Sequence, residues 1–438
     1  MPTPKNVRRI ALDLLSGCAA GRYSNLALDA AIKKHSLIPA DRGLLTLLVM
    51  GVIEKQITLD YYIDKLSALP PGKIEPEIRT ILRLGLYQLI FTDRIPDHAA
   101  VSETVSLAPR RASGFVNALL RRFLRERDNI ALPPRDGNFP EYLSVKYSFP
   151  AGLCKRFVGI FGPGRTESLL SAFDKTPGLT LRVNTLRTTR EGLLAKFAES
   201  GITAAPTDLS PDGVCLDTAP PALLPGFEEG LFFVQDEASQ LSVRALGAHP
   251  GMTVIDACAA PGSKSFGIAL AMQNTGRVLS FDLHESRLPL IDSGADKLGI
   301  EIIETTPGDA SLPDPALFVS ADRVLCDVPC SGYGVMAKKP EIRYKNPADV
   351  AGLPEVQYAI LDNCSKYLKP GGLLVYSTCT ILPEENEEVV GRFLAGYPDF
   401  HLSPFTAGAL SSDGMITLYP DTHHTDGFFI ACMKKGLK

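Results

Sequence analysis

The stretch ADRVLCDVPCSG, residues 321–332, predicts a buried strand that ends in a turn, and GGLLVYSTCT, residues 371–380, repeats the pattern. Both apolar runs are typical of strands in a parallel sheet. A cysteine follows each run, Cys330 and Cys379. Because ligands of open parallel sheets bind beyond the carboxyl ends of the strands, we expect both thiols at one site. The position of the two cysteines alone has two interpretations of about equal weight. One is covalent catalysis by an activated thiol, and the other is a pair of inert buried cysteines.

Strand, turn and helix patterns alternate from about residue 231 onward, which predicts a doubly wound α/β domain with a mostly parallel sheet. The final strand is expected to run antiparallel. The candidate strands are TVIDAC (253–258), RVLSFD (277–282), IEIIET (300–305), RVLCD (323–327), LLVYST (373–378) and FFIACMKK (428–435).

The composition is that of a globular protein of two or three domains: 438 residues, 45% hydrophobic and 21% charged. No apolar run reaches transmembrane length, and the N-terminal sequence lacks the apolar core of a secretion signal. Nine scattered cysteines include no C-x-x-C pair, so no metal site is expected. Reduced thiols in a cytoplasmic protein are the simplest interpretation.

Charge is distributed unevenly. Residues 1–130 hold 19 Lys+Arg and 13 Asp+Glu, a net charge of +6. Because the whole chain has a net charge of −4, residues 131–438 carry a net charge of −10. A basic module suggests a polyanionic partner. The densest cluster places Arg121, Arg122 and Arg125 on one exposed helical face, where their guanidinium groups could bind the phosphate groups of such a partner. An ordinary solvated helix face has about equal weight.

Helical periodicity continues through residues 1–132. The segment ALPPRDGNFP, residues 131–140, interrupts it and predicts a domain boundary. Residues 141–230 mix helical and strand patterns and predict a small α+β domain, and residues 231–438 form the predicted α/β domain.

The first strand of the α/β domain runs into a turn of small residues, DACAAPGSK at 256–264, which lets backbone N–H groups approach a ligand. A dinucleotide is not favoured, because no G-x-G-x-x-G occurs. Asp282 ends the second strand, where an acid can bind ribose hydroxyls, and Asp309 could reach an adenine amino group. S-adenosylmethionine fits this combination.

These motifs, in this order, resemble those of the RNA 5-methylcytosine methyltransferases of the RsmB/Sun (Fmu) and NOP2/NSUN superfamily. The matching motifs are QDEASQ (235–240), DACAAPGSK (256–264), DVPCSGYG (327–334), KPEIRY (339–344), KPGGLLVYSTCT (369–380), PEENE (383–387) and DGFFIA (426–431). Residues 1–130 resemble a NusB-like RNA-binding domain through ILRLGLYQL (81–89), IPDHAAVSETV (95–105) and FVNALLRRF (115–123). Together they imply a bacterial enzyme that methylates one cytosine of 16S ribosomal RNA, free or within a 30S assembly intermediate; we expect a monomer.

The resemblance also implies roles for individual residues. Cys379 matches the nucleophile, Cys330 the cysteine that assists product release, and Asp327 the acid that contacts the target base. The S-adenosylmethionine contacts are implied to be Cys258, Ala259, Ala260, Pro261, Gly262, Ser263, Lys264, Asp282, Asp309 and Asp327. Lys339 and Arg343 join the three helical arginines as candidate RNA contacts.

One departure concerns the cofactor turn, where most bacterial members have glycine in place of Ser263. Serine suits a helix N-cap. A positive φ there would cost serine about 1 kcal/mol.

The chemistry needs both thiol and acid. Attack of the Cys379 thiolate on carbon 6 of cytosine would make carbon 5 an enamine nucleophile. Asp327, protonated or acting through a proton, would stabilise charge at ring nitrogen 3. A nearby cation would favour the thiolate, for which Lys264, Lys338, Lys339 and Arg343 are candidates. Tyr333, Tyr344 and Phe281 are candidates for stacking on the extruded base, although packed rings are the more common case.

Other functions remain open on sequence alone. They are a 5-methylcytosine methyltransferase acting on tRNA or 23S ribosomal RNA, a non-catalytic NusB-like RNA-binding factor, and a small-molecule methyltransferase.

Overall fold

The computed structural model describes residues 6–18, 24–217 and 220–437, and the chain divides into two compact units. Unit 1 consists of residues 1–174 and 339–344, and unit 2 of residues 175–338 and 345–438. The division at Asp174 differs from the boundary expected at 131–140: three further helices after that linker pack with unit 1. Within the described residues, no helix is long and apolar enough to cross a membrane.

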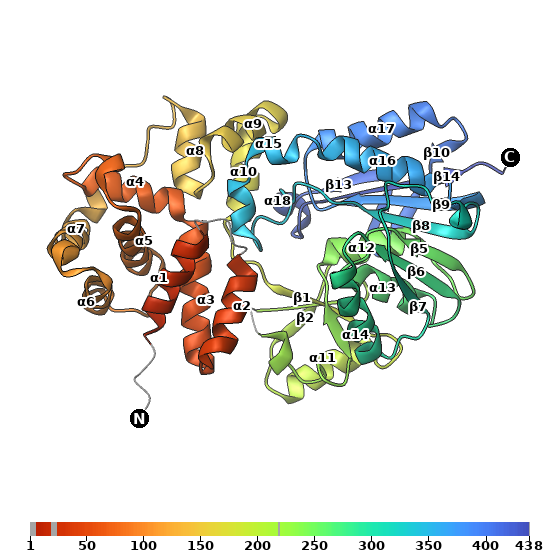
Figure 1. Cartoon of the computed structure of the whole chain (residues 1–438), viewed down its shortest axis with the longest axis horizontal. Coiled ribbons are helices and arrows are strands. Elements are labelled where there is room, and N and C mark those ends of the chain that lie inside the picture. Colours follow the sequence, from red (N-terminus) through yellow and green to blue (C-terminus); the bar gives the residue numbers. More distant parts are fainter. Residues whose placement is uncertain (1–5, 19–23, 218–219, 438) are drawn as a thin grey trace. The chain divides into compact units, whose positions relative to one another are not determined.

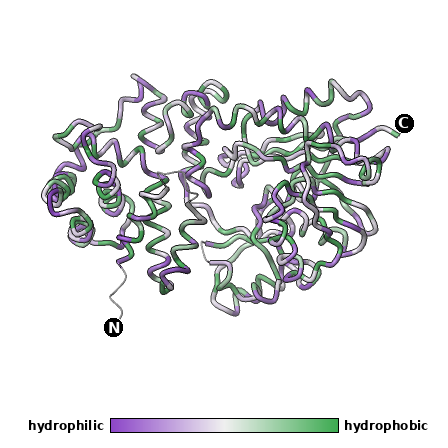
Figure 2. Tube along the Cα trace, viewed as in Figure 1, coloured by the Kyte–Doolittle hydropathy of each residue, from purple (hydrophilic) through white to green (hydrophobic). Residues whose placement is uncertain are grey.

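Unit 1 is helical (Figure 1). Its helices are α1 (Val7–Cys18), α2 (Ser24–His35), α3 (Pro39–Glu54), α4 (Gln56–Leu66), α5 (Pro76–Phe91), α6 (Asp97–Leu107), α7 (Arg110–Glu126), α8 (Phe139–Tyr147), α9 (Ala151–Phe161) and α10 (Pro163–Phe173). Hydrophobic and hydrophilic residues alternate along these helices (Figure 2), and the apolar stripes of α1–α7 share one core. α7 shows the pattern clearly, burying Val116, Leu119, Leu120 and Phe123.

Unit 2 begins with a four-stranded antiparallel sheet in the order β2-β3-β1-β4. Its strands are β1 (Leu179–Val183), β2 (Ala204–Pro206), β3 (Gly213–Leu216) and β4 (Phe232–Val234). Helix α11 (Arg190–Glu199) contributes Leu193 and Phe197 to their core. This confirms the strands and the helix expected in the middle of the chain.

The main sheet of unit 2 has the order β10-β14-β9-β8-β5-β6-β7, and β13 also pairs with β14. The strands are β5 (Thr253–Asp256), β6 (Arg277–Asp282), β7 (Ile303–Pro307), β8 (Ala321–Asp327), β9 (Leu368–Thr378), β10 (Phe400–Leu402), β13 (Met415–Leu418) and β14 (Phe428–Lys435). β7, β6, β5, β8 and β9 are parallel, whereas β14 runs antiparallel to β9. All six strands expected from sequence are present.

Two separate apolar cores cover the two faces of this sheet. α12 (Glu237–Ala245), α13 (Ser263–Ala271) and α14 (Leu288–Leu298) contribute to one core. α16 (Leu353–Ser365) and α17 (Glu387–Gly396) contribute to the other. The doubly wound arrangement brings the carboxyl ends of β5, β6, β7, β8 and β9 to one edge, where the predicted site residues lie.

Candidate active site

The two cysteines that follow β8 and β9 are adjacent. Cys330 Sγ lies 3.0 Å from Cys379 Sγ, and the Cys379 backbone N–H donates to Cys330 Sγ over 3.3 Å. The two strands are parallel neighbours, with Asp327 paired to Ser377, so both turns leave the sheet at the same level. The hydrogen bond to Cys379 and burial raise the pKa of the Cys330 thiol well above its ordinary value. Cys330 is therefore suited to remain a neutral S–H donor toward the Cys379 sulfur.

Asp327 is held in place by a cation and a hydroxyl. Lys264 Nζ lies 2.7 Å from Asp327 Oδ2, and the Ser377 hydroxyl donates to Oδ1 over 2.7 Å. Burial alone would lower the pKa of Lys264, but the charge of Asp327 and the hydrogen bond to it outweigh burial and raise that pKa. The Cys379 charge acts on Lys264 in the same direction. The ammonium group of Lys264 and the hydroxyl of Ser377 therefore fix the orientation of the Asp327 carboxyl group.

Of the four cations proposed to support a thiolate, Lys264 forms an ion pair with Asp327, and the charge of Cys379 also acts on it. Lys338 instead contacts two carboxylates, Asp236 and Asp426. Lys339 and Arg343 belong to unit 1.

The turns that carry the cysteines are fastened by buried polar groups for which sequence reasoning assigned no role. The Ser331 backbone N–H donates to Glu385 Oε2 over 2.9 Å, and the Ser331 and Thr380 hydroxyls are 2.8 Å apart. Glu385 is 2% exposed and also accepts from Gln357. The sequence feature that could have indicated a role for Glu385 is its position in the PEENE motif, one of the motifs shared with the family.

Backbone packing adds a third strand end to the same site. Gly334 donates its N–H to the Cys379 carbonyl oxygen over 2.9 Å, and Gly427 donates to the Gly334 carbonyl oxygen over 2.9 Å. A Cβ on Gly334 would lie 1.8 Å from the Gly427 carbonyl oxygen. The motifs DVPCSGYG, STCT and DGFF therefore meet through glycine contacts that no larger residue permits.

The predicted cofactor residues lie at the carboxyl ends of β5, β6 and β7. Asp282 accepts hydrogen bonds from the N–H groups of Ala260 and His284 over 3.2 and 3.0 Å and is 4% exposed. Asp309 follows β7 and is exposed. The turn from Cys258 to Lys264 connects β5 to α13. Carboxylates at neighbouring strand ends suit the hydroxyl and amino donors of a nucleoside, so these residues fit S-adenosylmethionine.

Ser263 does not act as expected. Gly262 is the N-cap of α13 and has φ of 109°, whereas Ser263 is the first helical residue. A Cβ on Gly262 would lie 2.5 Å from the Phe266 ring. The residue that requires glycine is therefore Gly262, and serine at 263 carries no positive-φ cost.

Asp256 lies beneath this turn. It is fully buried, accepts a hydrogen bond from the Ser265 hydroxyl over 2.7 Å, and its other oxygen, Oδ1, has no partner. Burial raises the pKa of Asp256 to about 6. A proton on this carboxyl group is therefore favoured below that pH.

The helical arginines have different environments. Arg121 and Arg125 are exposed on α7, whereas Arg122 also donates to the Leu66 carbonyl oxygen and to Glu126. Arg121 lines a groove of about 700 Å³ between α6 and α7, together with Asn117 and His98. Lys339 is exposed.

Arg343 was assigned wrongly as an RNA contact. Its side chain is 0% exposed, and its guanidinium donates to backbone carbonyl groups inside unit 1. Two stacking candidates are corrected for the same reason: Tyr333 is 2% exposed, and Tyr344 packs on the core of unit 1. Phe281 is partly buried against the core that includes α16.

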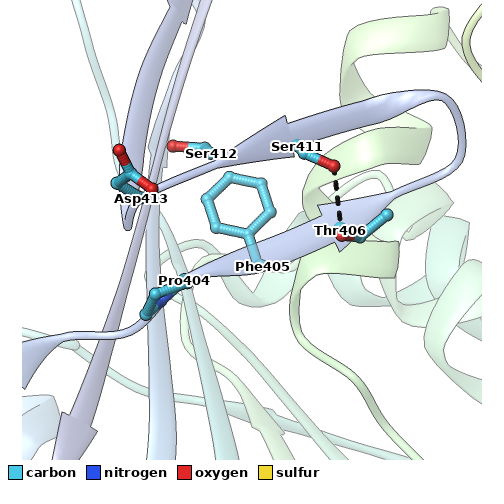
Figure 3. A pocket seen from close by; sticks show the side chains of 6 residues that line it. All are labelled: Pro404, Phe405, Thr406, Ser411, Ser412 and Asp413. Atoms are coloured by element: carbon cyan, nitrogen blue, oxygen red, sulfur yellow. Dashed lines mark hydrogen bonds between the residues drawn. The ribbon is translucent and has the colours of Figure 1, made fainter.

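A separate surface hollow lies on the hairpin of β11 (Phe405–Ala407) and β12 (Leu410–Ser412) (Figure 3). Phe405, Ser412 and Asp413 are among the residues that line it, and it contains none of the residues predicted from sequence. We assign it no role in the reaction.

The chain is similar over nearly its whole length to curated bacterial proteins. It is 39% identical over 431 residues to the probable ribosomal RNA small subunit methyltransferase B of Synechocystis, covering 94% of this chain and 96% of the relative. Identity to the protein of the same name in Bacillus subtilis is also 39%, over 448 residues, covering 98% and 99%. The chain belongs to the RsmB family. The Klebsiella pneumoniae family member is 36% identical, covering 90% of each chain.

Family models match three consecutive regions of this RsmB family member. They are the NusB family at residues 5–125, the RsmF/B-like ferredoxin-like domain at 149–222, and the 16S rRNA methyltransferase RsmB/F family at 243–434. The solved structure of PH0851 superposes with a TM-score of 0.79 at 28% identity, covering 99% of this chain and 100% of that one. A methyltransferase homologue from Pyrococcus horikoshii gives 0.59 at 29% identity, covering 67% and 97%. The resemblance and the fold class predicted from sequence are confirmed.

Proposed function

We propose that this RsmB family member methylates carbon 5 of a cytosine in 16S ribosomal RNA through a transient bond between Cys379 Sγ and carbon 6. The observation that carries the proposal is the 3.0 Å approach of the Cys330 and Cys379 sulfur atoms beside the Lys264–Asp327 ion pair. A thiolate needs positive potential nearby, and Lys264 provides it. Family membership supports the 16S substrate and the methyl transfer.

We assign the role of nucleophile to Cys379 because its STCT motif matches the nucleophilic cysteine of the family. The raised pKa of Cys330 keeps its proton, so its S–H can donate to the Cys379 sulfur. Bonding of Cys379 to carbon 6 breaks the ring conjugation and makes carbon 5 nucleophilic. S-adenosylmethionine, when bound, supplies the electrophilic methyl group.

In the last step the carbon 5 proton passes to water. The electron pair of that C–H bond re-forms the double bond between carbons 5 and 6, which expels Cys379 as a thiolate and restores the aromatic ring. The departing thiolate keeps the hydrogen bond from Cys330, which lowers the cost of this step. Asp327 is the acid placed to contact the base, at a position where the hydroxyl of Ser377 and the ammonium of Lys264 fix its orientation.

The turn from Cys258 to Lys264, with Asp282 and Asp309, would hold the cofactor. Asp282 suits the ribose hydroxyls and Asp309 the adenine amino group. The exposed residues Arg121, Arg125 and Lys339, together with Arg122, are proposed to bind RNA phosphate.

Trapping of the covalent intermediate tests the proposal. The Cys330→Ala variant should accumulate an RNA–protein adduct that survives a denaturing gel, because release is impaired, whereas Cys379→Ala should form none. The reverse result would exchange the two roles, and no adduct or methyl transfer with wild-type protein would refute the function. Parallel reactions with 16S, 23S and transfer RNA, read by bisulfite sequencing, identify the substrate.

A further inference from the structure

The segment KPEIRY, residues 339–344, belongs by sequence to the loop between β8 and β9 but by structure to unit 1. It forms a short 3-10 helix, Pro340–Tyr344, in which Pro340, Ile342 and Arg343 are buried. The residues before and after it belong to unit 2. The same loop carries Cys330, so the chain passes from the thiol into the helical unit and back.

Arg343 binds the C-terminal ends of three helices of unit 1. Its guanidinium donates to the carbonyl oxygens of the last residues of α3, α8 and α10, namely Glu54 at 3.3 Å, Tyr147 at 3.4 Å and Phe173 at 3.2 Å. Helix C-termini leave carbonyl groups without donors and carry partial negative charge. The guanidinium group has five N–H donors, so one arginine can donate a hydrogen bond to a carbonyl oxygen at each of the three helix ends. This explains why a charged side chain is buried there.

The surroundings compensate the buried charge. The guanidinium carbon lies 4.1 Å from the centre of the Phe149 ring, a cation–π distance. Burial lowers the pKa of Arg343, and the charges of Glu54, Tyr344 and Asp174 oppose that effect. The Tyr344 hydroxyl donates to the Ile53 carbonyl oxygen over 3.0 Å and fastens the end of the segment to α3.

Both flanks of the segment are fastened to unit 2. Before it, Lys338 forms ion pairs with Asp236 and with Asp426, the latter at 2.8 Å. After it, Lys345 Nζ donates to the carbonyl oxygen of Ser331 over 2.7 Å, and Ser331 directly follows Cys330. The segment 339–344 is therefore fastened within unit 1, and the residues on either side of it are fastened within unit 2.

We propose that Arg343 is a positioning residue for the methyl-transfer site: by closing three helix ends it fixes residues 339–344 and so restrains the loop that begins with the Cys330 turn. The inference rests on the proposed function, but its structural part can be measured without any turnover. Arg343 contacts no reacting atom, so its effect must appear in loop order and in kcat rather than in cofactor affinity.

The experiment uses the full chain and the Arg343→Met variant, which keeps much of the volume and removes every donor. Hydrogen exchange of residues 331–346 should rise by about 10-fold or more, with exchange in β5 and α13 unchanged. kcat should fall by about 10-fold or more and KM for S-adenosylmethionine should stay within about twofold. Arg343→Lys should recover part of both effects, because an ammonium can reach some of the carbonyl oxygens.

Arg79→Met is the matched control. Arg79 is a mostly buried arginine of unit 1 that binds Asp60, Asp64 and the Pro71 carbonyl oxygen, and it is not part of the inserted segment. It should leave loop exchange and kcat near wild type. Equal losses in both variants, or unchanged loop exchange in Arg343→Met, would overturn the proposal. An inactive wild-type protein would refute the proposed function, while the exchange result would still decide whether Arg343 holds the loop.

Discussion

Lys264 Nζ lies 2.7 Å from Asp327 Oδ2, which ties the first turn of α13 to the carboxyl end of β8. This ion pair joins a residue of the predicted cofactor turn to the residue that stands three positions before Cys330. It also explains how Asp327 can be implied in both cofactor and base contacts, because it stands at the junction of the two groups of residues.

Replacing Lys264 with Met should slow methyl transfer by about 100-fold or more, because the thiolate of Cys379 loses its neighbouring cation. Alkylation of Cys379 by iodoacetamide at neutral pH, followed by mass spectrometry, should slow by about 10-fold. Lys369→Met is the matched control: it breaks another lysine–aspartate ion pair of β8, with Asp322 at the amino end of that strand, and should leave the Cys379 alkylation rate much closer to wild type. Equal alkylation rates in wild type and Lys264→Met would contradict the assignment.

Gly334→Ala should abolish activity and lower the free energy of unfolding by more than about 2 kcal/mol, because its methyl group would overlap the Gly427 carbonyl oxygen. Gly391→Ala is the control: Gly391 lies in α17 with no atom within 4 Å of its added Cβ. That change should be neutral or stabilise by up to about 1 kcal/mol. Circular dichroism melts and radiolabel transfer measure both, and an active Gly334→Ala enzyme would show that the loops can separate.

Asp256 should make stability depend on pH. Its pKa is raised from 3.8 to about 6 in the folded protein, so the folded state binds the proton more tightly than the unfolded state. This contribution to stability is present below about pH 4 and is lost as the pH rises through 6. Asp256→Asn mimics the protonated group and should remove this slope, a difference of at most about 3 kcal/mol. Parallel slopes for both proteins in denaturant unfolding at pH 4–7 would refute the assignment.

The double change of Arg121 and Arg125 to Met should weaken RNA binding uniformly across sequences. Loss of two phosphate contacts should lower the slope of log K against log salt by about 1.4 to 1.8. Affinity for S-adenosylmethionine should not change, because neither residue belongs to unit 2. Filter binding at several salt concentrations measures the slope, with Lys33 and Lys34, two exposed lysines of α2, changed to Met as the control. An unaltered slope in the arginine variant would exclude this face as an RNA contact.

Local sequence patterns were enough to predict the class of fold, the order of the strands along the chain, and the two cysteines with their motifs. An apolar run followed by a turn predicts a parallel strand, because both faces of a parallel sheet are buried and its strands must therefore be apolar on both sides. That local rule predicts that Cys330 and Cys379 lie at the same edge of the sheet, as they do in the structure. The cofactor turn could also be predicted, because its small residues let backbone N–H groups approach a ligand, which is a local property of the turn.

The folded chain was needed to show that Lys264 pairs with Asp327 and that residues 339–344, in the loop between β8 and β9, belong to unit 1. Arg343 looked like an RNA ligand because it stands near the catalytic motif in sequence. Instead it closes the ends of α3, α8 and α10, which are some 170 to 290 residues away along the chain. In the same way, the folded structure shows that the positive φ is at Gly262, where the ring of Phe266 leaves no room for a Cβ, and not at Ser263. Charge and conformational preference are local properties, whereas burial and partners depend on segments that meet only when the chain folds.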